Sequence, residues 1–256
     1  MCFQFSKNGL ICHLCRRKEC GIIIQIMRTC TARYYAMDKF KKTEVITLTK
    51  QEVCIKACDV LEQVYPESVC ALHYAHPYQL VIAVRLSAQC TDARVNIVTK
   101  ELFAKYPTLE SFAEADLAEL EAVIKPCGFY HMKAKSIKEM ANQLLTQFGG
   151  ELPHTMEELL TLSGVGRKSA NLILGDIFGQ PTIVADTHFI RITGRLGLTK
   201  HKEPEKVERD LRKLVPPERS SDFCHRVVQF GRDVCRARKP LCSNCPMADF
   251  CKSAEK

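Results

Sequence analysis

Four cysteines near the C-terminus constrain the fold of this chain more than any other feature. They are spaced C-x6-C-x2-C-x5-C within seventeen residues, and they are Cys235, Cys242, Cys245 and Cys251. Four thiolates in one loop are a complete ligand set for one metal centre. Zinc ribbons usually present two close pairs, but only Cys242 and Cys245 are closely paired here. The spacing favours a 4Fe-4S cluster, with zinc as the alternative, and predicts a metal that braces the terminus.

The remaining composition argues against a secreted disulfide scaffold. The chain has 15 cysteines among 256 residues, but it is long, helical in pattern and without a credible signal peptide. No apolar run approaches the roughly 20 residues that span a bilayer. We expect a reducing compartment, the bacterial cytoplasm, with no membrane partner.

The net charge of +8 is concentrated at the N-terminus. Residues 1–42 hold nine basic and two acidic residues, whereas the rest of the chain is nearly balanced. DNA binding by the folded body must therefore depend on local patches. Two candidate patches, each of which could equally be a solvated helix face, are Arg226, Arg232, Arg236, Arg238 and Lys239, and Lys125, Lys133, Lys135 and Lys138.

Residues 1–36 differ from the rest of the chain because they show no sustained helical period. The amphipathic pattern begins after Met37, so we expect the natural start at Met37 and residues 1–36 to be non-native or disordered. Two alternatives remain open. One is a basic transit or tail segment, and the other is a second metal site that uses Cys12, Cys15 and Cys20.

Beyond residue 45 the chain has the periodicity of successive amphipathic helices. Pro77 is suited to open a helix, Thr91 to cap the next one, and Asp116 to cap another. A further helix is expected over residues 131–148, where Gly149 and Gly150 end it. The one strand-like run, PTIVAD at 181–186, is too short and solitary to build a sheet. The sequence predicts an all-α fold.

The segment LTLSGVGRKSA at 160–170 predicts a tight turn between two helices. Gly164 and Gly166 permit the turn and a close backbone approach, while Val165 would anchor it in the core. Backbone amides beside a helix N-terminus bind phosphate oxygens, and Arg167 follows directly. An ordinary turn between helices is the alternative.

Lys168 is unusual because the positive end of the helix dipole disfavours a lysine in the first turn. That field, together with partial burial, would raise the fraction of neutral, nucleophilic amine. Asp186 could stabilise the positive charge that develops on a sugar, and it is also suited to cap the helix that begins at Thr187. Taken alone, however, the position of Lys168 favours a lysine that contacts phosphate or solvent over a nucleophile.

These segments together resemble the endonuclease III family of helix-hairpin-helix DNA glycosylases. The resemblance rests on LSGVGRKSANLIL, PTIVADTH and the four-cysteine tail, and upstream on RLSAQCTDARVN (85–96) and GFYHMKAKSI (128–137). It covers roughly residues 45–256. Family members usually have proline before the first hairpin glycine, whereas this chain has Ser163, which we expect to make the turn less rigid.

The resemblance implies two α-helical lobes. The first is a six-helix domain at 70–180, with the helix-hairpin-helix at 156–178. The second joins 37–69 to 181–256 and holds the iron–sulfur cluster.

The resemblance also implies the roles of individual residues. Lys168 would be the nucleophile and Asp186 the catalytic carboxylate. Gln89 would enter the duplex where the damaged base has been flipped out, and Phe129 would be a wedge between base steps. DNA phosphates would be held by the hairpin residues Gly164, Val165, Gly166 and Arg167 and by the cluster-loop residues Arg236, Arg238 and Lys239.

The implied activity is that of a base-excision-repair glycosylase and AP lyase. It would act on double-stranded DNA with oxidised pyrimidines or abasic sites, as a monomer associated with the nucleoid. An adenine-mismatch glycosylase is the closest rival, but that branch lacks a lysine at position 168 and usually has an extra C-terminal domain. A non-catalytic DNA-binding or electron-transfer protein would need no lysine–aspartate pair.

Overall fold

The computed structural model describes residues 5–6, 9–10, 48–67 and 69–254. Strands β1 (Phe5–Ser6) and β2 (Gly9–Leu10) form a short antiparallel pair. Residues 48–254 belong to a separate compact unit, and every regular element described in that unit is helical. The all-α fold predicted for the body of the chain is confirmed. The expected start at Met37 and the possible site at Cys12, Cys15 and Cys20 lie outside the described residues.

One hydrophobic core is built from a continuous stretch of chain. Its buried residues run from Leu72 to Leu174. The helices of this first lobe are α3 (Pro77–Ser87), α4 (Asp92–Lys105), α5 (Leu109–Glu114), α6 (Leu117–Ile124), η1 (Lys125–Cys127), α7 (Tyr130–Phe148), α8 (Met156–Leu159) and α9 (Arg167–Phe178).

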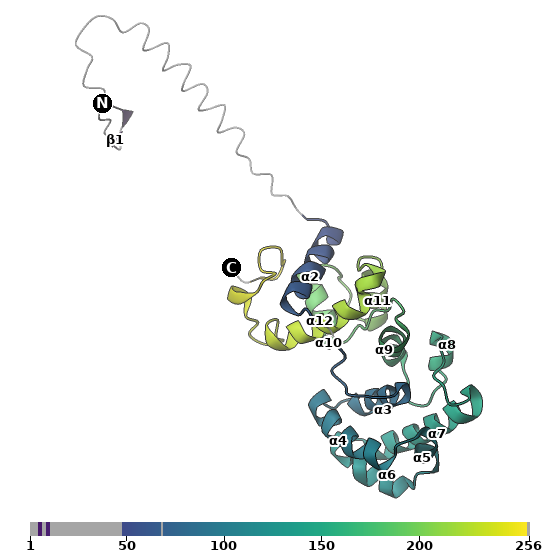
Figure 1. Cartoon of the computed structure of the whole chain (residues 1–256). Helices are drawn as coiled ribbons and strands as arrows, with labels where there is room; N and C mark the ends of the chain where they lie inside the picture. The colour runs from purple at the N-terminus through teal and green to yellow at the C-terminus, as the bar shows by residue number, and fades with distance from the viewer. Residues whose placement is uncertain (1–4, 7–8, 11–47, 68, 255–256) are drawn as a thin grey trace, which may run out of the picture. The chain divides into compact units, whose positions relative to one another are not determined.

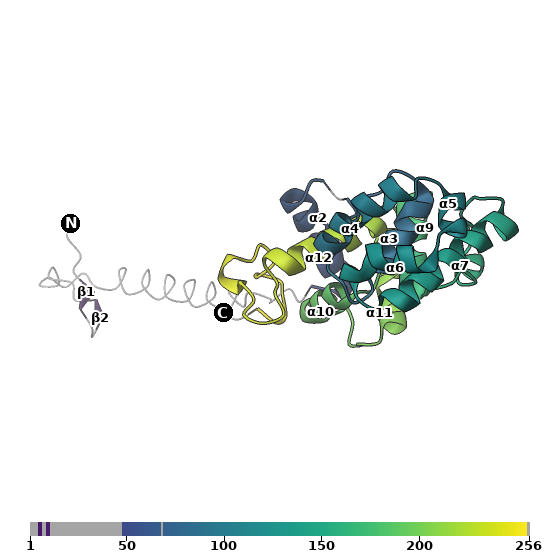
Figure 2. The same ribbon diagram turned by 90° about the horizontal axis from the view of Figure 1, so that it is seen from below.

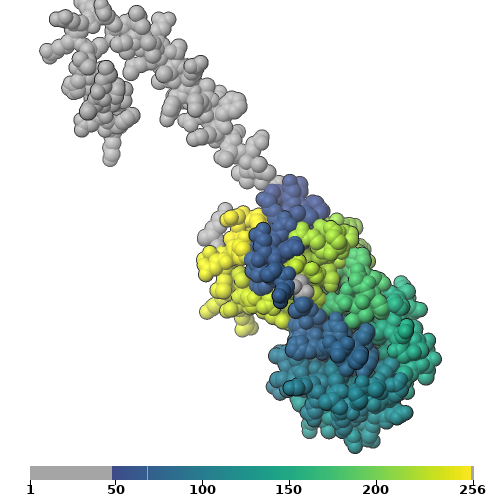
Figure 3. Space-filling model, in the orientation of Figure 1, coloured from purple at the N-terminus to yellow at the C-terminus, as the bar shows by residue number. Residues whose placement is uncertain are grey.

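The second core joins the two ends of the described body. It buries one face of α2, including Val53, Ala57 and Leu61, against residues from Ile183 to Met247. Its helices are α2 (Lys50–Val64), α10 (Thr187–Leu196), α11 (Pro204–Leu211), η2 (Pro217–Arg219), α12 (Ser220–Asp233) and η3 (Cys242–Asn244). Figure 1 shows α2 beside α12, and Figure 3 shows α2 in dark blue against the yellow C-terminal segment.

The division of the chain at residues 70 and 180 stays a prediction, and these two cores support it. Figure 2 shows α7 near one end of the helical unit and the C-terminal loop at the other. Local capping explains where several helices begin. The side chains of Thr91 and Asp116 accept backbone N–H groups of α4 and α6, as expected.

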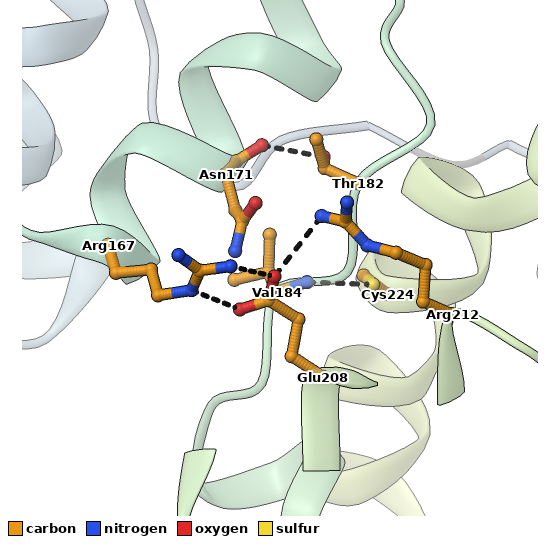
Figure 4. A network of polar contacts seen from close by, with 7 residues as sticks. All are labelled: Arg167, Asn171, Thr182, Val184, Glu208, Arg212 and Cys224. Atoms are coloured by element: carbon orange, nitrogen blue, oxygen red, sulfur yellow. Dashed lines mark hydrogen bonds and ion pairs between the residues drawn. The ribbon is translucent and has the colours of Figure 1, made fainter. Parts of the chain in front are cut away.

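The strand-like run at 181–186 forms no strand but connects the two lobes as extended chain. The Thr182 hydroxyl donates to the Asn171 carbonyl at 2.7 Å, and the Val184 N–H donates to Cys224 Sγ at 3.3 Å (Figure 4). These bonds fix the segment that leads to Asp186. Among the described residues, no helix combines the length and apolar character needed to cross a bilayer.

Candidate active site

A cleft of about 570 Å³ lies where the two groups of helices meet. Gln89, Asp92 and Lys168 line it from the first lobe, while Asp186 and Arg232 line it from the second. The structure thus places both predicted catalytic side chains, and the predicted inserting glutamine, at one cavity. Arg232 also pairs with Asp92 across this cleft.

Lys168 is the second residue of α9, whose N-cap is Gly166. Its amine therefore lies in the first turn, near the positive end of the helix dipole, as the sequence indicated. The expected partial burial is not found, because Lys168 is exposed to solvent. The Lys168 side chain therefore lines the cleft and is still exposed to water.

Asp186 is the N-cap of α10 and is half-buried. Its Oδ1 accepts the Phe189 N–H at 2.7 Å, which fixes the carboxylate in one orientation. His188, on the same turn, also lines the cleft, and burial lowers its pKa although Asp186 opposes this effect. Its Nδ1 lies 3.2 Å from Arg191 Nη2.

The hairpin has the backbone form that its glycines predicted. Gly164 has φ +80°, and a Cβ built on it would lie 2.6 Å from Arg85 Nε. Val165 is buried in the first core, whereas Gly164 and Gly166 are exposed. The exposed amides precede α9 and can face a phosphate.

Arg167 has a partner within the protein. Its Nε and Nη2 donate to the two carboxylate oxygens of Glu208, each at 2.8 Å, and Arg212 donates to the same carboxylate at 3.1 Å (Figure 4). Glu208 is only 6% exposed. Arg167 therefore ties the start of α9 to α11, and its predicted phosphate contact must compete with this bidentate pair.

Ser163 compensates for the absence of proline in this hairpin. Its N–H donates to Gln143 Oε1 at 2.8 Å, and its hydroxyl donates to Glu139 Oε2 at 2.9 Å. Proline has no N–H and could make neither bond. The turn is therefore held by two bonds to α7, and the expectation that it is less rigid than a turn with proline stays a prediction.

The two residues predicted to enter the duplex both protrude from left-handed backbone. Gln89 has φ 56° and lies in the cleft, and Phe129 has φ 49° with 66% of its surface exposed. Non-glycine residues rarely adopt this conformation, so each must be held by its surroundings.

Several basic residues of the two candidate patches are not available to DNA. Arg226 is 6% exposed and donates to the Tyr65 carbonyl, and Lys133 is 1% exposed. Lys138 donates to the Ala115 carbonyl at 2.6 Å. The patches were wrong at Arg226 and Lys133, which are buried, whereas Lys138 is half-buried and one of its donors is bound to a carbonyl. The cluster-loop residues Arg236, Arg238 and Lys239 are exposed as expected.

The sequence also carried a signal for Lys133 that was missed. Lys133 is spaced with Ile137, Met140 and Leu144 along the buried face of α7. The position therefore belongs to the apolar stripe of the helix, where a lysine must find partners inside the protein.

The four C-terminal cysteines lie around one mostly apolar cavity, together with Leu196, Phe230 and Met247. All four are free thiols and half-buried. Burial, and to a smaller extent the neighbouring cysteines, raises the pKa of Cys245 and of Cys251. Arg195 Nη1 donates to Cys235 Sγ at 3.2 Å.

This donor set fits an iron–sulfur cluster, whose positive iron ions would neutralise four clustered thiolates in an apolar surround. Among the described residues, no group of three or more His, Cys, Asp or Glu side chains is placed to hold a single metal ion.

Comparisons with known proteins agree with this geometry. Residues 82–217 match the HhH-GPD superfamily base excision DNA repair protein, and residues 235–251 match the iron-sulfur binding domain of endonuclease III. Endonuclease III of Synechocystis sp. is 46% identical over 197 residues, which cover 77% of this chain and 90% of that protein. This chain belongs to the endonuclease III family. It is a DNA glycosylase and AP lyase of base excision repair, and it carries a 4Fe-4S cluster.

Other endonuclease III proteins are similarly close. The Bacillus subtilis protein is 41% identical over 83% of this chain and 96% of its own length, and the Escherichia coli K12 protein is 37% identical over 86% and 99%. A solved non-covalent endonuclease III–DNA complex superposes with TM-score 0.77 at 41% identity, covering 81% of this chain and 97% of that one. A trapped endonuclease III–DNA covalent intermediate gives TM-score 0.76 with the same identity and coverage. These two structures of similar proteins contain DNA, which supports DNA as the partner of this chain.

Proposed function

We propose that this endonuclease III family member removes oxidised pyrimidines from double-stranded DNA and then cuts the strand 3′ to the abasic site by β-elimination. The observation that carries the proposal is the shared cleft, in which an amine on the first turn of α9 and the carboxylate that caps α10 line one cavity. A cavity of about 570 Å³ is large enough to receive a single nucleotide.

Several groups of this chain would hold the DNA. The exposed hairpin amides of Gly164 and Gly166, and the exposed cluster-loop residues Arg236, Arg238 and Lys239, would contact phosphates. Gln89 would occupy the space left by the flipped base, and Phe129 would separate the adjacent base step. The cluster would supply the folded frame of the loop that presents those three basic residues.

The chemistry follows from the two cleft residues. The neutral amine of Lys168 attacks C1′, the bond from C1′ to the base nitrogen breaks, and the base leaves after it gains a proton. Asp186 stabilises the positive charge on the sugar through the carboxylate that Phe189 orients. The ring bond from C1′ to O4′ then breaks as O4′ gains a proton, which leaves an iminium between C1′ and the lysine nitrogen. Loss of a proton from C2′ then expels the 3′ phosphate by β-elimination.

We also propose that the enzyme works as a monomer in the bacterial cytoplasm, associated with the nucleoid through its DNA substrate. Both cores and both walls of the cleft come from one chain, which supports the monomer. Sedimentation at micromolar concentration, with and without DNA, measures this directly, and a dimer in the free protein would contradict it.

Borohydride trapping tests the nucleophile. With a duplex that contains an abasic site, the wild-type enzyme is expected to form a covalent adduct that Lys168→Ala abolishes. The control is Lys100→Ala, which removes an exposed lysine of α4 outside the cleft lining. An undiminished adduct in Lys168→Ala would falsify the assignment.

The substrate class needs a separate assay. Duplexes with an oxidised pyrimidine, with adenine opposite an oxidised guanine, and with an intact abasic site distinguish the proposed activity from its rivals. Excision of only the mismatched adenine, without strand cleavage, would establish the rival instead. Binding without excision or cleavage would identify a non-catalytic protein.

A further inference from the structure

Lys133 is a buried cation that joins two loops. The residue is 1% exposed, and its Nζ donates to three carbonyl oxygens: Leu86 at 2.8 Å, Ala88 at 2.8 Å and Cys127 at 2.9 Å. An ammonium group has three N–H donors and no acceptor, so these bonds use its full capacity.

The three carbonyls belong to the ends of two helical elements. Leu86 is in the last turn of α3, with Ala88 as the C-cap, and Cys127 is the last residue of η1. The carbonyls at the end of a helix lack partners within it and carry partial negative charge, so a cation there is favoured. Lys133 therefore caps both elements with one group.

Each capped element leads directly to one of the residues proposed to enter DNA. Gln89 follows Ala88, and Phe129 comes two residues after Cys127. Both have left-handed backbone, and both side chains are exposed. Neither side chain can hold its own loop in place by burial, so the hydrogen bonds beneath the loops must do so.

The groups around Lys133 act on its charge in both directions. Burial lowers its pKa, while the nearby thiols of Cys127 and Cys90 act in the opposite direction. Arg85, which packs beneath the hairpin glycine Gly164, is close enough to disfavour a second positive charge. The group is therefore held by backbone carbonyls, and no surface anion is needed to explain its position.

We propose that Lys133 is a positioning residue that fixes the separation of Gln89 and Phe129, so that the two side chains enter the duplex together. This inference rests on the DNA-inserting roles proposed for those two residues. The ammonium serves as a non-covalent cross-link between the loops and touches neither substrate nor the reacting atoms.

The test separates duplex probing from chemistry. Lys133→Met keeps the length of the side chain but removes all three donors. Single-turnover excision of an oxidised pyrimidine from duplex DNA is expected to fall about 100-fold, because a displacement of about 1 Å in a positioned group can cost that much. Lyase cleavage of a preformed abasic site in a single strand, which needs Lys168 but no insertion into a duplex, is expected to change less than about 3-fold.

The matched control is Lys100→Met, which makes the same substitution at an exposed position of α4, outside the cleft lining and outside both candidate patches. It is expected to leave both rates unchanged. A second variant, Lys133→Gln, retains two donors and should show a smaller loss of duplex excision. It also serves where Lys133→Met does not fold.

A double-mutant cycle with Gln89→Ala decides whether Lys133 acts through the loop. Gln89→Ala should slow excision in the wild type but add little in the Lys133→Gln background, since residues that act as a unit are not additive. Equal losses of duplex excision and single-strand lyase activity would show a merely structural lysine, as would additive losses in the cycle, and either would overturn the proposal. If the wild type excises no oxidised pyrimidine but cleaves abasic sites, the proposed substrate fails, and abasic-duplex cleavage then provides the same comparison for Lys133.

Discussion

Gly164 meets two separate requirements at the residue scale. Its φ of +80° is unfavourable for residues with a Cβ, and that Cβ would lie 2.6 Å from Arg85 Nε. Arg85 cannot move aside freely, because its Nη2 donates to Ser136 Oγ at 3.1 Å. The conformation of the hairpin therefore depends on its own backbone and also on the Arg85 side chain of α3, which packs against Gly164.

We predict that Gly164→Ala lowers the free energy of unfolding by about 2 kcal/mol, from backbone strain and overpacking together. Urea denaturation measures this. The control is Gly194→Ala in α10, where a Cβ meets nothing within 4 Å and the helix should gain slightly in stability. Equal effects of the two substitutions would show that the predicted crowding at Gly164 is absent.

Arg167 gives a second prediction at this scale. Arg167→Ala removes a bidentate partner from the buried Glu208 carboxylate and should cost about 1–2 kcal/mol, reduced from the fully buried case because Arg167 is 45% exposed. Arg212→Ala removes one bond of 3.1 Å and should cost less. If Arg167→Ala instead weakens DNA binding without loss of stability, its main partner is phosphate.

At the scale of elements, α7 supports most of the DNA-facing features. Lys133 near its N-terminus holds the loops of Gln89 and Phe129, and Gln143 in its later turns holds the hairpin. Gln143 accepts the Ser163 N–H and donates from Nε2 to the Thr161 carbonyl at 3.2 Å. Helix α7 therefore holds both the two loops proposed to enter the duplex and the hairpin proposed to bind phosphate.

We predict that Gln143→Ala loosens the hairpin and lowers stability by about 1–2 kcal/mol, since two bonds are lost and one of them leaves a backbone N–H without its partner. Affinity for duplex DNA should fall with it, measured by fluorescence anisotropy. Gln147→Ala, one turn later and exposed, is the control and should have no effect on either quantity. A normal hairpin in Gln143→Ala, judged by unchanged hydrogen exchange at Val165, would contradict this role.

The helices themselves were largely predictable, and the reason is local. Caps such as Thr91 and Asp116 and the terminating Gly149 act within one turn of chain, so their signals lie in neighbouring residues. The basic patches were predictable only in part. Lys133 was assigned to a DNA-facing patch because charge suggested exposure, but the register of its helix and the carbonyls of distant loops place it inside.

On the scale of the whole molecule, the cluster site holds a tail with little regular structure. Residues 235–251 contain only the short helix η3, yet Met247 is 1% exposed in the second core. Bonds from Arg195 to the Arg236 and Ala237 carbonyls attach the same segment to α10. Without the cluster, these few contacts must hold the loop that presents Arg236, Arg238 and Lys239.

We therefore predict that Cys251→Ser removes the visible absorption of the 4Fe-4S cluster and lowers the Tm by about 5 °C, because the tail no longer packs on the second core. Binding to duplex DNA should weaken as the basic loop is released. Cys70→Ser, outside the cluster segment, should leave the absorption intact. Full absorption and iron content in Cys251→Ser would mean that this thiolate is not a ligand.

The sequence by itself determined the helices and the turn at the hairpin glycines, and it predicted the ligand set of the cluster, because each depends on residues that are close together in the chain. Only the tertiary structure decided which distant groups meet. It places Lys168 and Asp186 at one cleft. It also pairs Arg167 with Glu208 and buries Lys133 among the backbone carbonyls of two loops. These contacts depend on how the two cores pack and on which helix faces turn inward, and neither is encoded in any one segment.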